Sequence, residues 1–117
     1  MEILERFNAL RLWDFWVESF GTSKEVGNDV LVIHAGQDFP DCYATLRFND
    51  TEYISCPMLF HHARFRLATE AEVRMVRHLV EYESTLFAVD TDVCNDVGER
   101  TYFVAAKTVA VDLPAHE

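Results

Sequence analysis

The chain has 117 residues, half of them hydrophobic, and carries 20 Asp and Glu against 10 Lys and Arg, a formal net charge of −10. This length and the nine Phe, four Tyr and two Trp predict a single globular domain spanning 1–117 rather than a disordered chain. The charge disfavours direct binding to nucleic acid and to anionic membranes, and it favours a protein partner with a basic surface.

Residues 2–20 are predicted to form a helix that ends at Gly21, because helix-favouring residues are frequent and neither Gly nor Pro interrupts them. Most apolar side chains of this helix share one broad arc, and Leu4 and Phe15 fall outside it. The charged residues in the segment argue against a signal peptide and a membrane span. With no CxxC among its three cysteines, the chain is expected in the cytoplasm with free thiols.

The next segments predict strands. Residues 29–35 are rich in β-branched side chains, which favour a strand. Residues 42–48 and 52–58 are predicted to form a hairpin around a three-residue turn at 49–51, with Leu46 opposite Ile54. A two-residue turn would shift the return strand by one residue. Residues 59–68 are expected to form an irregular or extended connection.

The second half of the chain predicts one helix and two strands. Thr69 and Glu72 match a capping box, so a helix is expected over about 70–83. Residues 85–90 predict a central strand, 92–100 an acidic loop, and 101–113 a long strand bent near 105–107. The order α-β-β-β-α-β-β predicts an α+β fold, with a mainly antiparallel sheet of about five strands and two helices packed against it.

The charges are segregated along the chain. Two acidic stretches, 25–56 and 81–99, flank a basic island at 61–78, which indicates a polarised surface. A basic partner would contact carboxylates of the later stretch, with a second group in the earlier one: Asp90, Asp92, Asp96 and Glu99, then Asp38, Asp41 and Asp50. The basic island either neutralises this acid within the molecule or contacts an anion through Arg64, Arg66, Arg74 and Arg77.

Chemical motifs are weak. Cys56, His61 and His62 lack the paired ligand spacing of a structural zinc site. Cys94 is the best candidate for a nucleophilic thiol, although the neighbouring aspartates disfavour its thiolate form. Asp90 and Asp92 could hold Mg²⁺ or Ca²⁺, but their surroundings lack the Gly and terminal Glu of an EF-hand loop. We therefore expect no catalytic residue, no metal and no cofactor.

In size, acidity and lack of a catalytic motif, the chain is similar to bacterial immunity proteins and phage anti-defence proteins, including anti-CRISPRs and DNA mimics. The resemblance implies a small inhibitor of a basic or nucleic-acid-handling protein. One alternative is a structural or oligomeric module, such as a homodimer, that assembles through the apolar N-terminal helix and uses Trp13, Phe15 and Trp16 as interface residues. Another is a small enzyme that uses Cys94 or a carboxylate pair.

Overall fold

A computed structural model describes residues 1–22, 29–80, 84–92 and 99–113. Within these residues, eight strands form one antiparallel sheet in the order β4-β7-β6-β5-β1-β2-β3-β8. The prediction of about five strands is therefore wrong. The strands are β1 (Asp14–Thr22), β2 (Asp29–Gly36), β3 (Ala44–Asn49), β4 (Tyr53–Ile54), β5 (Leu59–Leu67), β6 (Thr85–Asp92), β7 (Glu99–Ala106) and β8 (Thr108–Asp112).

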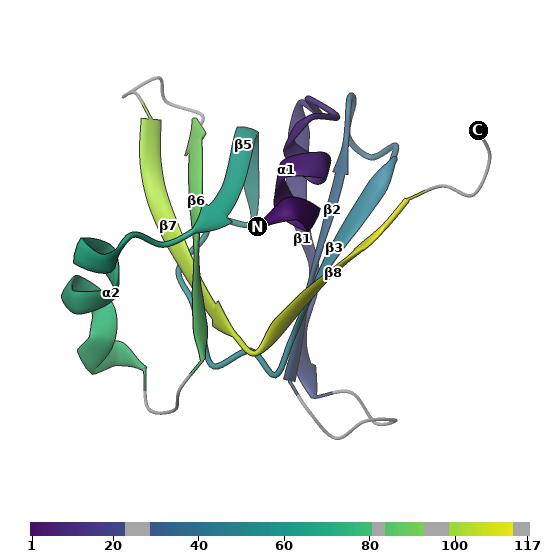
Figure 1. The fold of residues 1–117 in the computed structure, drawn as a ribbon. Coiled ribbons are helices and arrows are strands. Elements are labelled where there is room, and N and C mark those ends of the chain that lie inside the picture. The colour runs from purple at the N-terminus through teal and green to yellow at the C-terminus, as the bar shows by residue number, and fades with distance from the viewer. Residues whose placement is uncertain (23–28, 81–83, 93–98, 114–117) are drawn as a thin grey trace.

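The sheet is bent into two arms that enclose a short helix (Figure 1). Strands β5, β6 and β7 form one arm, and β1, β2, β3 and β8 form the other. The arms are joined by a short pairing of β1 with β5, which runs from Asp14 opposite His61 to Trp16 opposite Leu59. Helix α1 (Glu2–Asn8) lies between the arms, so both inner faces of the sheet pack around it.

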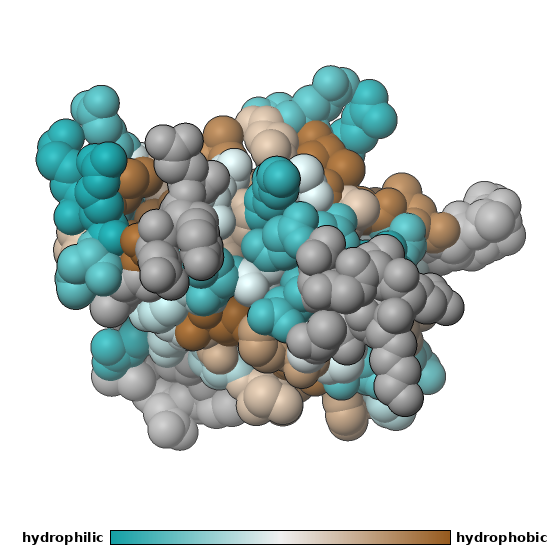
Figure 2. Space-filling model, turned by 90° about the horizontal axis from the view of Figure 1, so that it is seen from below, coloured by the Kyte–Doolittle hydropathy of each residue, from teal (hydrophilic) through white to brown (hydrophobic). Residues whose placement is uncertain are grey.

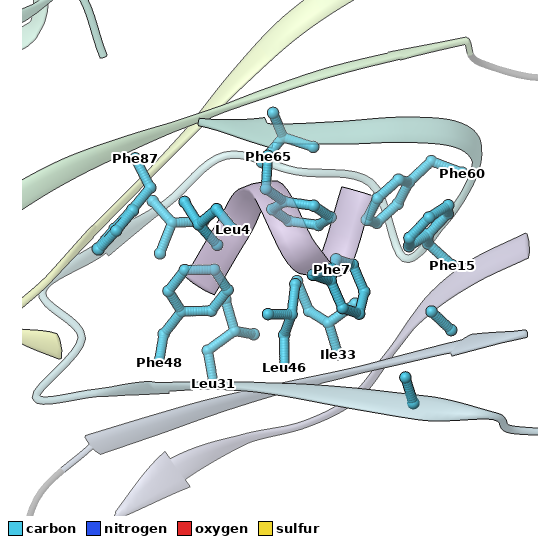
Figure 3. Close-up of a cluster of buried hydrophobic side chains, with 14 of the residues drawn as sticks. Leu4, Phe7, Phe15, Leu31, Ile33, Leu46, Phe48, Phe60, Phe65 and Phe87 are labelled. Atoms are coloured by element: carbon cyan, nitrogen blue, oxygen red, sulfur yellow. The ribbon is translucent and has the colours of Figure 1, made fainter. Parts of the chain in front are cut away.

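The main core lies where α1 meets the inner faces of the strands (Figure 3). Leu4 and Phe7 project from α1 into this space and are 1% and 3% exposed. The ring of Phe7 packs edge-on against Phe65, with centroids 5.7 Å apart, and against Phe15, at 6.1 Å. The strands contribute further large side chains that are fully buried: Leu31, Ile33, Leu46, Phe48, Phe60, Phe87, Val89 and Val104.

The predicted helix over 2–20 is wrong beyond Asn8. The chain reverses at Arg11, whose φ of 53° lies in the left-handed region, and continues as β1. Leu4 and Phe15, which the helical arc placed away from the core, are both buried, and Phe15 is 2% exposed. The arc failed because it assumed one continuous helix, whereas in β1 alternate residues face opposite sides of a sheet.

The predicted hairpin over 42–58 is also wrong. β3 pairs with β2 on one side and β8 on the other, so Leu46 lies opposite Ile33 and Val111 rather than Ile54. The return segment contributes only the two residues of β4, which pair with β7. The turn at Asp50, with φ of 54°, sends the chain away from β3 instead of back along it.

Within residues 59–68, expected to be an irregular or extended connection, Leu59–Leu67 form the nine-residue strand β5. His61 of β5 pairs with Asp92 of β6, and Arg64 pairs with Asp90. Because β5 advances three residues where β6 advances two, β5 contains a bulge with one extra residue. The extra residue shifts the alternation, which lets Phe60 and Phe65 both face the core despite their odd separation. The predicted strands at 29–35 and 85–90 are confirmed. The single bent strand predicted over 101–113 is wrong, because the chain breaks at Lys107 into β7 and β8, which pair with β6 and β3.

A second, smaller core lies on the outer face of β6 and β7, beneath helix α2 (Glu70–Val76). The predicted capping box of Thr69 and Glu72 is confirmed. The α-helix is shorter than predicted, because a 3₁₀ turn, η1 (Arg77–Leu79), replaces it after Val76. Val76 is 6% exposed and packs with apolar side chains from β6 and β7: Leu86, Ala88, Phe103 and Ala105.

The two helices of the described chain have seven residues each, and neither has the length or apolar content needed to cross a membrane. Seen from below, hydrophilic side chains cover the side of the molecule that carries α2, and hydrophobic side chains appear at several separate places (Figure 2). The outer surface of the other arm, which no described helix covers, holds the candidate site.

Candidate binding site

A groove of about 580 Å³ opens on the outer face of β1 and its neighbours. The strand register places Leu59 of β5, Trp16 of β1, His34 of β2 and Thr45 of β3 in one row across four strands. Because Leu31, Ile33 and Ala35 of β2 face the core, His34 faces outward by simple alternation. Leu59, Trp16 and His34 of this row line the groove, so the register builds its floor from three strands that are far apart in the sequence.

The walls of the groove are largely apolar. Phe39 packs edge-on against Trp16 with ring centroids 4.9 Å apart, and Pro40, Val17, Met58 and Leu59 complete the lining. Trp16 is 8% exposed, whereas Phe39 and Met58 are 52% and 69% exposed. Large apolar side chains that are both exposed and gathered at a concave surface are typical of a ligand or protein contact.

Three polar side chains complete the lining: Glu18, His34 and Cys42. His34 Nδ1 lies 2.9 Å from the hydroxyl oxygen of Thr45, and His34 Nε2 lies 3.7 Å from a carboxylate oxygen of Glu18. The thiol of Cys42 donates to the carbonyl oxygen of Ala44 at 3.3 Å and lies 3.6 Å from the Thr45 hydroxyl. The groove thus places one carboxylate, one imidazole and one thiol beside aromatic rings.

The turn at 37–41 forms one rim of the groove and is held in two ways. The amide of Phe39 donates to Asp14 Oδ2 at 2.8 Å, and the amide of Asp41 donates to the Asp38 carbonyl oxygen at 2.8 Å. The second oxygen of Asp14 lies 2.9 Å from His61 Nδ1, so this buried carboxylate has partners on both sides. Gly36 completes the arrangement, because a Cβ at this position would overlap the Asp41 carbonyl oxygen.

The earlier acidic group is divided by this geometry. Asp38 and Asp41 are exposed and flank Phe39 and Pro40 at the rim of the groove. Among the described residues they form no ion pair. Asp50 lies just past the other end of β3 and does not reach the groove. The structure therefore places two of these three carboxylates on the same surface.

The later acidic group is partly neutralised within the molecule. Arg66 donates to both oxygens of Glu72, at 2.8 and 2.9 Å, and to both oxygens of Asp90, at 2.7 and 3.2 Å. Hydrogen bonds from Arg66 lower the pKa of Glu72 from 4.5 to about 2. Burial opposes ionisation of Asp90, but hydrogen bonds from Arg66 and Thr101 outweigh it and hold its pKa below the ordinary value. The same bonds raise the pKa of Arg66.

The remaining members of that group lie nearby or outside the described chain. Asp92 faces His62, with Oδ2 and Nδ1 3.0 Å apart. Glu99 begins β7 and is paired in register with Asp92. Asp96 lies outside the described residues. The carboxylates at 90 and 92 are thus on one face of β6, as alternation predicts, but both have cationic or imidazole neighbours.

The four arginines of the basic island differ in their contacts within the molecule. Arg66 has its donors directed at two carboxylates, which leaves little capacity for an external anion. Arg74 lies 3.7 Å from Glu70 on the surface of α2. Arg64 and Arg77 are exposed. The contacts of Arg66 and Arg74 favour the interpretation that these two arginines neutralise acid within the molecule.

The aromatic residues at 13–16 divide among three environments. Phe15 is in the core, and Trp16 forms part of the groove. Trp13 is 52% exposed and packs edge-on against His62, with ring centroids 3.9 Å apart. Only Trp13 of this trio therefore offers a large exposed surface at some distance from the groove lining.

The described thiols differ in character. Cys56 is half-buried, and desolvation by burial raises its thiol pKa to about 11, so it is a poor nucleophile. Cys42 is exposed and lines the groove. Cys94 lies outside the described residues. In the described parts of the chain, no three His, Cys, Asp or Glu side chains are arranged to hold a metal ion.

Sequence reasoning did not identify Glu18, His34, Cys42 or Phe39 as a group. The available signal for His34 was weak, because alternation in 29–35 places it on the same face as Val30 and Val32, and both faces of this strand are apolar. Glu18 was not identified, because its segment was interpreted as part of a helix. Comparison with known proteins adds no information on this site, because no family model, curated protein or solved structure matches the chain.

Proposed function

We propose that this protein is a small acidic, non-enzymatic binding protein that contacts a basic surface on another protein and acts as its inhibitor. The target class is a basic or nucleic-acid-handling protein. The observation that supports this proposal is the combination of an apolar groove with the exposed carboxylates of Asp38 and Asp41 at its rim. Apolar and aromatic anchors supply most of the affinity at protein interfaces, and surrounding charges speed encounter and select the partner.

The main contact surface is the earlier acidic group rather than the later one. Asp90 already accepts hydrogen bonds from Arg66 and Thr101, so a partner would have to compete with bonds inside the molecule. Asp38 and Asp41 face no such competition from the described residues. The free thiols of Cys42 and Cys56 are compatible with a reducing compartment, and we place the protein in the cytoplasm on that basis.

Assembly through the N-terminal helix has less support than partner binding. The apolar side chains of α1, Leu4 and Phe7, are buried between the two arms of the sheet. The exposed positions of α1 include Glu2, Glu5 and Arg6, which would not form an apolar interface. A homodimer would therefore have to use a different surface.

Quantitative affinity capture from lysate of the source organism tests the proposal. The wild-type protein is compared with the double variant Asp38→Lys/Asp41→Lys at low and at high salt, with bound proteins identified by mass spectrometry. We expect the wild type to retain a basic protein in a salt-sensitive manner, because attraction between exposed charges is screened by salt. The rim variant should lose that protein.

The matched control is Glu5→Lys/Glu70→Lys, which changes the net charge by the same amount at exposed positions on α1 and α2. This control should retain the partner nearly as well as the wild type. Equal loss in both double variants would show that net charge alone governs capture. Unchanged capture by the rim variant would contradict the proposal.

A further inference from the structure

We infer that the groove receives an arginine side chain of the partner protein. This inference rests on the proposed function and specifies the chemistry of the contact. The groove combines aromatic rings, sulfur and aliphatic surface with one carboxylate, and it lies within a molecule whose net charge is −10. An arginine side chain has matching parts: an apolar stem of three methylene groups and a planar cation at its end.

The apolar wall fits the stem and the flat face of the guanidinium. Phe39 and Met58 are 52% and 69% exposed, so both offer surface that a ligand would cover. Phe39 is held in place by its edge-on contact with Trp16 and by the bond from its amide to Asp14. A guanidinium group is weakly hydrated and stacks on aromatic rings, whereas a lysine ammonium is a compact and strongly hydrated charge.

Glu18 supplies the complementary charge. Its side chain is 54% exposed, and its nearest described partner is His34 Nε2 at 3.7 Å, a distance beyond a hydrogen bond. The carboxylate therefore retains acceptor capacity for the paired N–H donors of a guanidinium. Asp38 and Asp41 at the rim add long-range attraction for a cationic segment. Carboxylate, ring and rim charge together favour arginine over an uncharged side chain of similar shape.

An NMR titration tests the inference with small probes. The ¹⁵N-labelled protein is titrated with N-acetyl-arginine methylamide and, separately, with N-acetyl-citrulline methylamide, which has nearly the same shape but no charge. We expect saturable shifts of the Trp16 indole and the His34 backbone amide with the arginine probe, in the millimolar range. The citrulline probe should bind more weakly.

Two variants locate the contact. Glu18→Gln should weaken binding of the arginine probe by roughly threefold to fivefold, because it removes the charge of an exposed pair while preserving shape. Glu5→Gln, at an exposed carboxylate on α1, should leave binding unchanged. Phe39→Ala, which removes the exposed ring, should also weaken binding. A well-dispersed amide spectrum of each variant verifies that it is folded.

Several outcomes would overturn the inference. The inference is wrong if the arginine and citrulline probes bind equally, or if N-acetyl-lysine methylamide binds as tightly as the arginine probe or more tightly. It is also wrong if Glu18→Gln has no effect, or if the shifted amides belong to the carboxylate-bearing residues of α1. The result is separable from that of the proposed function. If the arginine probe fails but partner capture still depends on Asp38 and Asp41, the binding function stands and the occupant of the groove is different.

Discussion

The guanidinium of Arg66 binds the carboxylates of Glu72 and Asp90 and thereby connects β5 with α2 and β6. Glu72 also accepts a hydrogen bond from the amide of Thr69, so the same carboxylate caps the helix. A charged group with this many bonds is costly to disturb, because removing one partner leaves the others without compensation. The interaction fixes the position of α2 over the outer core.

Arg66→Met should lower the free energy of unfolding at pH 7 by about 1–2 kcal/mol, after allowance for solvent screening at this partly exposed cluster. The pKa of Glu72 is lowered from 4.5 to about 2 in the folded state. Its contribution is therefore fully present above pH 4.5 and is lost as the pH falls towards 2. Urea denaturation at pH 7 and at pH 3 should show a smaller difference between wild type and variant at the lower pH.

The comparison variant is Arg74→Met, at an exposed arginine 3.7 Å from Glu70 on the same helix. This substitution should change the free energy of unfolding by less than about 0.5 kcal/mol. An equal loss in the two variants would show that the hydrogen-bonded cluster of Arg66 has no special role.

At the scale of elements, the turn at 37–41 depends on the absence of a side chain at Gly36. A Cβ there would overlap the carbonyl oxygen of Asp41, which is a backbone atom that cannot rotate away. Gly36→Ala should therefore displace the rim of the groove and lower the free energy of unfolding by about 1–3 kcal/mol. Thermal unfolding followed by circular dichroism measures the loss, and the chemical shift of the Phe39 amide reports the displacement.

Gly21 provides a matched comparison within the same sheet. A Cβ at Gly21 would meet no other atom within 4 Å. Gly21→Ala should leave stability unchanged or slightly higher, since alanine restricts the unfolded chain. A similar destabilisation by both substitutions would contradict the close-contact explanation for Gly36.

Several elements could be predicted because their signals are local. The capping box of Thr69 and Glu72, the β-branched run at 29–35 and the apolar run at 85–90 each indicate a structure without reference to the rest of the chain. β1 was misassigned because it is apolar on both faces. Phe15 points to the core and Trp16 to the groove, so alternation is masked and the segment imitates a helical arc.

Other elements depend on partners that are distant in sequence. Phe48 pairs with Val109 across the sheet, and nothing in the local pattern at 42–58 indicates this pairing. The bulge between His61 and Arg64 removes the regular alternation that would have indicated β5. For the candidate site, the sequence indicated Asp38 and Asp41 but not their neighbours, because the groove forms only where β1, β2 and β5 lie side by side.

At the scale of the whole molecule, stability depends on how α1 fills the space between the two arms. Asn8, the last residue of α1, donates to the Phe65 carbonyl oxygen at 2.7 Å and accepts from the Phe65 amide at 2.9 Å. The Asn8 side chain thus provides hydrogen-bond partners for the amide and carbonyl of Phe65, which lies outside the three residues of β5 that pair with β1. The helix therefore contacts both arms through apolar packing, and Asn8 adds hydrogen bonds to the arm that contains β5.

Phe7→Ala should lower the free energy of unfolding by about 3–5 kcal/mol, the usual effect of removing a fully buried ring. Because domains of this size are stable by only about 5–15 kcal/mol, much of the total would be lost. Urea denaturation measures the change. Met75→Ala, at a side chain that is 61% exposed on α2, should stay within about 0.5 kcal/mol of wild type. A loss below about 1 kcal/mol for Phe7→Ala would contradict a central role for α1.

The path of the chain from β7 into β8 has a consequence for synthesis. The chain turns at Lys107 and delivers β8 to the opposite end of the sheet, where it pairs with residues 45–49 of β3. During translation, β3 leaves the ribosome long before its second neighbour exists, so its outer edge stays unpaired until residue 112 has emerged. Pairings between such distant residues are slow to form, and an open strand edge invites association with other chains. The nascent chain is therefore expected to need protection from aggregation until β8 is made.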